Sequence, residues 1–321
     1  MSGGALGWAL AVAALAVFGA GVGTYPIYLV SLALINVIAA LGLNLLTGNS
    51  GQISLCHSSF MAIGAYGATL LSSRYGLPFW AAIPLAGACS ALIGAALGFP
   101  ASRLKGIYLA LATLGFLQIV QLAIEELADI TGGVRGLKVP KPSLVAGFPL
   151  SEYGMYLVVI GVCGLGIWTA RNILASRIGR ELNAVRLSPH AAEALGISVA
   201  RVKLAAFALA AAYAGVAGGL LAVVVGFIDP VEFGVSASLR QITFIVVGGM
   251  GSVAGSVIGA VVLSALPEML RPVKEYSDVI YTVILLGFLL FVPRGLVTVW
   301  DRAAKTLRPK VAAPAIGGPA K

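Results

Sequence analysis

Apolar positions in this chain form long continuous runs instead of alternating with polar ones. The runs are separated by short polar segments and fall at about 5–22, 26–46, 52–72, 79–99, 107–124, 155–170, 204–226, 237–266 and 279–293. A helix needs ~20 mostly apolar residues to cross a bilayer. The pattern therefore predicts an all-α, polytopic bundle of transmembrane helices with about 8–10 membrane segments.

The run 237–266 differs from the others because Gly248, Gly249 and Gly251 interrupt it. Its first limb, 237–247, is too short to cross ~30 Å at about 1.5 Å per residue. We expect a re-entrant pair of half-helices with a glycine elbow, beside eight full spans. Irregular backbone at membrane depth needs surrounding protein or a water-filled cavity, so the elbow suggests a translocation path.

A second glycine-rich stretch, Gly48-Asn49-Ser50-Gly51, also precedes an apolar helix. Ile63-Gly64-Ala65 follows it, as Ile258-Gly259-Ala260 follows the elbow. Transporters are often built from duplicated halves. Chance matching in a glycine-rich membrane protein explains the similarity equally well.

Composition excludes a water-soluble fold. Hydrophobic residues make up 59% of the chain and charged residues only 10%, whereas soluble domains carry roughly 25% charged residues. The first charged residue is Arg74. The pattern places the membrane domain at residues 1–300, and a basic cytoplasmic tail, expected to be disordered, at 301–321.

The distribution of charge predicts the orientation of the spans. The net charge of +9 comes from basic residues between apolar runs and at the C-terminus, which argues against a nucleic-acid partner. The segment 171–203 holds six basic residues against Glu181 and Glu193, and the loop 100–106 holds two. The positive-inside rule places both, and both termini, in the cytoplasm. The more acidic loops 125–154, 228–236 and 267–278 fit the other face.

The segment 171–203 contains a short helix with clear boundaries. Ser188 can cap it, Pro189 suits its first position and Gly196 suits the left-handed residue after its end. About seven residues are too few to form a stable helix alone in water. The helix is either a connector on the membrane surface or a docking element for a cytoplasmic protein. Leu174, Ile178 and Leu182 predict an amphipathic stripe before it.

Polar side chains gather around the first glycine-rich turn and in the fifth run. They either line a pathway or hydrogen-bond between helices. The candidates for pathway lining are Asn44, Gln52, Ser54, His57, Ser58, Thr113 and Gln118.

The sequence carries no evident catalytic or metal-binding constellation. It has no Gly-Lys dipeptide, so a Walker loop is absent and ATP would be hydrolysed by another chain. The full spans contain no Asp, Glu, Lys or Arg, although ion-coupled carriers usually embed such groups. Arg240, near one mouth of the re-entrant segment, is expected to reach the interface. We expect a transporter subunit that is not an enzyme and needs no metal or cofactor of its own.

Several stretches resemble the permease subunits of branched-chain amino acid ABC importers, most closely the M-type subunit. They are 42–48 (GLNLLTG), 51–60 (GQISLCHSSF), 63–66 (IGAY), 104–110 (LKGIYLA), 131–133 (TGG), 192–197 (AEALGI), 199–203 (VARVK), 248–252 (GGMGS) and 291–296 (FVPRGL). The resemblance covers roughly residues 26–300. It departs from the family at Cys56, where a glycine commonly precedes the histidine.

The resemblance implies a place in a larger machine of the bacterial inner membrane. It implies alternating access, an H-type permease partner, two ATPases that bind ATP and Mg²⁺, and a periplasmic binding protein. The short helix would dock in an ATPase groove through Pro189, His190, Ala191, Ala192, Glu193, Ala194, Leu195 and Gly196. Other cargoes (urea, short amides or aromatic acids), a passive channel or secondary carrier, and a membrane-embedded enzyme remain alternatives.

Overall fold

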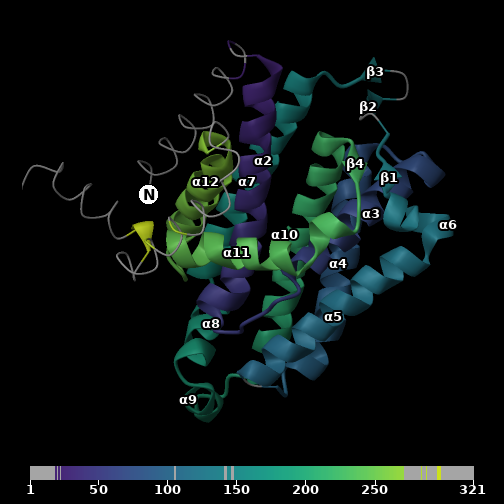
Figure 1. The fold of residues 1–321 in the computed structure, drawn as a ribbon. Coiled ribbons are helices and arrows are strands. Elements are labelled where there is room, and N and C mark those ends of the chain that lie inside the picture. Colours follow the sequence, from purple (N-terminus) through teal and green to yellow (C-terminus); the bar gives the residue numbers. More distant parts are fainter. Residues whose placement is uncertain are drawn as a thin grey trace, which may run out of the picture.

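The computed structural model describes residues 19, 21, 23–104, 106–140, 143–145, 148–270, 283, 287 and 295–297. Within them the protein is helical, apart from two small two-stranded sheets. The expected all-α bundle is confirmed (Figure 1). Lys105, the tail 301–321 and the predicted spans 5–22 and 279–293, except for residues 19, 21, 283 and 287, lie outside the described residues.

Five described helices are long and apolar enough to cross a membrane. They are α2 (Thr24–Leu43) with its π-helical continuation Asn44–Asn49, α4 (Phe79–Ala101), α5 (Ile107–Glu126), α7 (Glu152–Ala175) and α10 (Val199–Val225). Each matches a predicted run. The run 52–72 differs, because residues 51–56 are not helical and α3 spans His57–Tyr75.

Helix α10 lies at the centre of the bundle, against α2, α3 and α4. Glycines bring the backbones together. A Cβ atom on Gly64 of α3 would lie 2.0 Å from the carbonyl oxygen of Gly215 on α10. Gly94 and Gly98 of α4 likewise face Ala211 and Phe207 of α10. The small residues seen in the sequence therefore act as helix-packing positions.

The run 237–266 forms two helices, α11 (Val235–Gly248) and α12 (Val253–Met269). Figure 1 shows α11 crossing the bundle, whereas α12 runs alongside α2 and α7. We call α11 and α12 together the re-entrant unit. Gly226, which precedes it, lines the same cavity as Thr24. Met269, at its end, lines another cavity together with Leu29. Ser58, at the start of α3, donates a hydrogen bond to the carbonyl oxygen of Gly234, directly before α11. Helix α11 therefore begins inside the bundle, whereas α12 ends near the start of α2.

The elbow between α11 and α12 lies at the other end of α2. Gly249 and Gly251 have positive φ angles of 125° and 84°, which residues other than glycine rarely adopt. Gly248 and Gly249 are buried, and a Cβ atom on Gly248 would lie 2.0 Å from the carbonyl oxygen of Gly255. The two helices expected from the sequence are present, and their elbow is only partly covered by protein, because Met250 is 48% exposed.

The predicted cytoplasmic segments lie together. Helices α8 (Arg177–Leu187) and α9 (Pro189–Ala194) lie at one end of the bundle, named here the α9 end (Figure 1). Lys203 at the start of α10 donates a hydrogen bond to the carbonyl oxygen of Ser102, at 3.1 Å. This contact joins the segment 171–203 to the loop 100–106, as a shared face requires.

The loop 125–154 lies at the opposite end. It contains α6 (Ala128–Thr131), a 3₁₀ turn (Gly133–Arg135), β1 (Leu137–Lys138) and the hairpin of β2 (Ser143–Val145) with β3 (Phe148–Pro149). Strand β1 pairs antiparallel with β4 (Phe227–Ile228), and a 3₁₀ turn (Val231–Phe233) leads from β4 into α11. The two acidic loops 125–154 and 228–236 are therefore joined, which agrees with their predicted common face.

Candidate functional site

The two glycine-rich turns noted in the sequence meet in space. The side chain of Asn44 accepts a hydrogen bond from the amide of Gly251, at 2.8 Å, and donates one to the carbonyl oxygen of Ser252, at 3.2 Å. Asn49 donates to the carbonyl oxygen of Gly251. The side-chain amides of Asn44 and Asn49 thus form hydrogen bonds with the backbone groups of the elbow.

Most polar candidates from the sequence are buried and hydrogen-bonded to other parts of the protein. The ring nitrogen Nε2 of His57 lies 2.9 Å from the carbonyl oxygen of Ala39. The hydroxyls of Ser58 and Ser238 are 2.7 Å apart, linking α3 to α11. Gln52 donates to Ser50, the hydroxyl of Ser54 lies 3.3 Å from the sulfur of Cys56, and Thr113 accepts from the amide of Leu55. The contacts of His57, Ser58 and Thr113 fit the interhelical alternative, whereas those of Gln52 and Ser54 are local.

Gln118 lies apart from the others, because it is exposed on α5. The structure thus brings together Asn44, Gln52, Ser54, His57, Ser58 and Thr113 around the irregular segment 44–57, without Gln118. Their assignment to the pathway stays a prediction.

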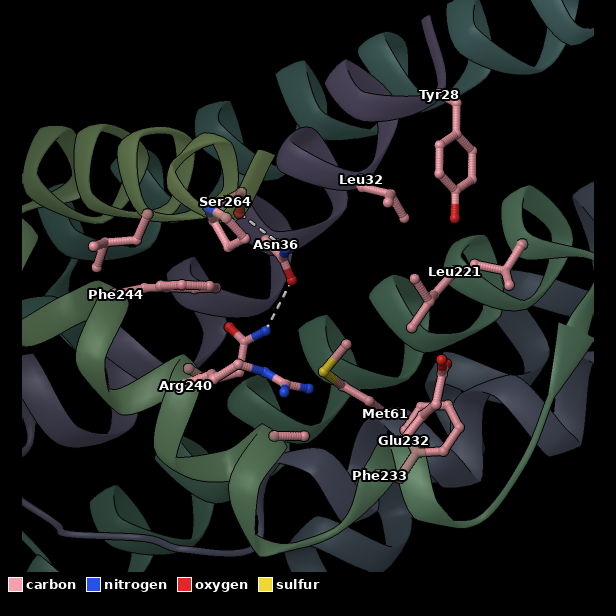
Figure 2. Close-up of a pocket in the computed structure, with 15 residues that line it drawn as sticks. Tyr28, Leu32, Asn36, Met61, Leu221, Glu232, Phe233, Arg240, Phe244 and Ser264 are labelled. Atoms are coloured by element: carbon pink, nitrogen blue, oxygen red, sulfur yellow. Dashed lines mark hydrogen bonds between the residues drawn. The ribbon is translucent and has the colours of Figure 1, made fainter. Parts of the chain in front are cut away.

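A cavity of about 600 Å³ opens between α2, α3, α10, α11 and α12, and we name it the chamber (Figure 2). Its volume lies within the roughly 300–1,000 Å³ usual for ligand pockets. Apolar side chains form much of its wall: Leu32, Met61, Leu221, Val225, Phe233, Phe244 and Leu263. None of the candidate pathway residues from the sequence lines it.

A chain of hydrogen bonds joins three helices at the chamber wall. The side chain of Gln241 on α11 donates to Asn36 on α2, at 3.0 Å, and Asn36 donates to Ser264 on α12, at 2.9 Å (Figure 2). Position 36 lies in the middle of α2, so these bonds hold the re-entrant unit to the bundle beside the chamber. Polar side chains commonly link membrane helices in this way.

Two charged side chains also line the chamber, Glu232 before α11 and Arg240 within it. Figure 2 shows both among apolar side chains such as Met61 and Leu221. Sequence reasoning assigned Arg240 only to the interface and gave Glu232 no role. The signal that could have identified them is their place on either side of the start of a re-entrant helix.

The segment 171–203 forms the predicted short helix. Ser188 accepts a hydrogen bond from the amide of Ala191, Pro189 is the first helical residue, and Gly196 has φ of +78°. The helix ends at Ala194, one residue earlier than expected. The predicted stripe is wrong in part, because α7 ends at Ala175 and a new helix caps on Ser176, so that Ile178 is exposed.

Two leucines that flank α9 are strongly exposed. Leu187 is 87% exposed and Leu195 is 79% exposed, on either side of α9. His190, Ala191, Glu193, Ala194 and Gly196 are exposed as well, Pro189 is half-buried, and Ala192 is buried against the chain itself. The docking role of these residues stays a prediction. Because Ala192 is buried, it would hold α9 in place and would not contact the partner.

The long apolar helices, the re-entrant unit and the chamber between them define a polytopic membrane protein of the permease class. The sequence profile described as "Branched-chain amino acid transport system / permease component" matches residues 25–292. The chain belongs to this family.

Relatives with curated names agree. The chain is 36% identical over 291 residues to the high-affinity branched-chain amino acid transport system permease protein LivM of Salmonella typhimurium, covering 83% of this chain and 68% of that protein. The LivM protein of Escherichia coli is similar to the same extent. The LivH permease protein of Salmonella typhimurium is 26% identical, with 81% of this chain and 90% of that protein covered. No solved structure matches.

Proposed function

We propose that this chain is the M-type permease subunit of an ATP-driven importer in the bacterial inner membrane. The importer moves branched-chain amino acids from the periplasm to the cytoplasm by alternating access. The observation that carries this proposal is the family match over residues 25–292, supported by 36% identity to LivM.

The proposed partners are an H-type permease, two ATPases and a periplasmic binding protein. Similarity to both LivM and LivH supports a pair of related permeases. The exposed leucines beside α9 support an ATPase contact, because an apolar helix face typically binds in a groove of its partner. ATP and Mg²⁺ would be held by the ATPases, since this chain has no Walker loop.

The α9 end would face the cytoplasm and the β2–β3 hairpin the periplasm. The surplus of basic residues in 171–203 supports this orientation under the positive-inside rule. Both termini would then be cytoplasmic. ATP-driven movement of the ATPases would act on α9 and, through it, on the membrane helices.

Co-purification in mild detergent from the native host tests the proposal. Recovery of a second permease and two ATPases, together with loss of leucine uptake when the gene is deleted, is the expected result. A chain that purifies alone and conducts solute in liposomes would instead be a channel or carrier. Loss of urea, amide or aromatic-acid uptake with leucine uptake intact would reassign the cargo.

A further inference from the structure

The lining of the chamber includes one positive and one negative side chain, Arg240 and Glu232. Neither the Arg240 guanidinium nor the Glu232 carboxylate has a hydrogen bond or an ion pair with any residue that the structure describes. The two charges interact electrostatically at a distance. The nearby Asp229 carboxylate accepts a hydrogen bond from the Glu232 amide and does not line the chamber.

Glu232 and Arg240 line the chamber and are also exposed, so the chamber is open where these two side chains lie. Glu232 precedes Phe233, whose ring packs edge-on against Tyr66 in the middle of α3. Arg240 precedes Gln241, which is bonded to Asn36 in the middle of α2. Both charges therefore lie level with the middle of the bundle, where a small molecule that enters the chamber can reach them.

The groups around the chamber complement one class of small molecule. A guanidinium binds a carboxylate through a two-pronged hydrogen-bonded pair, and a carboxylate accepts hydrogen bonds from an ammonium group. The wall between them is apolar, with Met61, Leu221 and Phe244. Opposite charges beside an apolar wall match an α-amino acid with an apolar side chain.

We propose that the chamber is an amino-acid binding site in which Arg240 binds the carboxylate, Glu232 binds the ammonium group and the apolar wall receives the side chain. This inference rests on the proposed import function and assigns a site to it. An aromatic acid without an ammonium group would leave Glu232 facing an anion. Urea or an amide would leave both charges without a counter-charge.

Equilibrium binding of radiolabelled leucine to the full chain, purified with its native partners into nanodiscs without the binding protein, tests the site. Two leucine analogues serve as competitors: 4-methylpentanoate lacks the ammonium group, and isopentylamine lacks the carboxylate. Each is expected to compete at least about tenfold more weakly than leucine, because it loses a hydrogen-bonded charge pair.

The variants should separate the two roles. Arg240→Gln should abolish the advantage of leucine over isopentylamine and keep its advantage over 4-methylpentanoate. Glu232→Gln should do the reverse. Arg103→Gln and Glu126→Gln, at exposed positions outside the chamber, serve as matched controls. A variant that merely misfolds would lose both preferences together.

Three results would overturn the site. The first is the absence of saturable leucine binding by the wild-type protein, and the second is unchanged competition in both chamber variants. The third is loss of a co-purifying permease while leucine binding stays intact, which would assign the two charges to a subunit interface. Leucine uptake by cells separates these from failure of the proposed function. If deletion of the gene lowers leucine uptake while the chamber variants bind normally, only the site is wrong.

Discussion

The guanidinium of Arg186 donates a hydrogen bond to the carbonyl oxygen of Gly48, joining residues 138 positions apart in the chain. Arg186 belongs to α8, immediately before α9. Gly48 belongs to the first glycine-rich turn, which is joined to the elbow by the hydrogen bond between Asn44 and Gly251. The Arg186 side chain also packs over Gly51. One side chain therefore connects the proposed docking segment to the point where α2 meets the re-entrant unit.

Replacing Arg186 with alanine should uncouple ATP hydrolysis from uptake. Without the guanidinium, movement of α9 would no longer reach the glycine turns. We expect leucine uptake to fall at least about fivefold, the lower range of a coupling free energy between sites, while ATPase activity persists. Uptake by whole cells and ATPase activity in nanodiscs measure the two quantities.

Arg177→Ala is the matched control for this experiment. Arg177 lies on the same helix and forms a surface ion pair with Glu181, at 2.7 Å. Such exposed pairs contribute little, so this variant should transport normally. Equal uptake by the two variants would show that Arg186 transmits nothing.

Replacing Gly196 with valine should also uncouple the machine while leaving membrane insertion intact. The glycine has φ of +78°, and a Cβ atom there would meet nothing within 4 Å, so strain in the backbone is the sole local penalty. A left-handed conformation costs an ordinary residue about 1–2 kcal/mol, which a six-residue helix cannot absorb.

Gly196→Asn provides the rescue for this prediction, because asparagine tolerates the left-handed region better than valine. Uptake should follow the order glycine, asparagine, valine, with equal amounts of protein in the membrane. Normal transport by the valine variant would remove the docking assignment from α9.

Replacing Asn44 with alanine should loosen the elbow. The change leaves the part-buried amide of Gly251 and the carbonyl oxygen of Ser252 without their side-chain partner, at a cost of up to about 1–3 kcal/mol per group. We expect a lower midpoint of thermal unfolding in detergent and reduced uptake. Asn172→Ala, exposed on α7, should change neither, and an equal shift in both variants would contradict the assignment.

Replacing Gly64 with alanine should destabilise the bundle, because its Cβ atom would lie 2.0 Å from the carbonyl oxygen of Gly215. The packed backbones of α3 and α10 would have to separate. Gly115→Ala on α5 is the matched control, since a Cβ atom there meets nothing within 4 Å. Alanine should leave that helix unchanged or stabilise it by up to about 1 kcal/mol. The midpoints of thermal unfolding of the two purified variants test this prediction. Similar midpoints would show that the backbones of α3 and α10 do not approach closely at Gly64.

The helices could be predicted from the sequence because long apolar runs and capping residues are local signals. Ser188, Pro189 and Gly196 identified α9 to within one residue. The meeting of Asn44 with Gly251 could not be predicted, because no local pattern shows which turn faces which. The similar glycine stretches suggested a repeat, and that similarity was the one available hint.

The chamber was missed for a related reason. Its wall takes one to four residues from each of five helices and two from the turn before α11. The polar residues that stand out in the sequence are instead bonded to backbone and hydroxyl groups. Glu232 and Arg240 belong to segments that read as a loop and an interface. Only the crossing of α11 under α2 turns them toward a shared space (Figure 1).

The antiparallel pair of β1 and β4 restricts how this protein can be recombined with its relatives. Leu137 pairs with Ile228, and the amide of Val139 donates to the carbonyl oxygen of Gly226, a few residues before Glu232. A chimera whose donor loop at 128–140 cannot form these backbone hydrogen bonds would break the ladder and displace the entrance to α11. The loop 128–140 and the rim of the chamber are therefore structurally coupled. A chimera that aims to change the cargo should exchange both segments, 128–140 and 226–241.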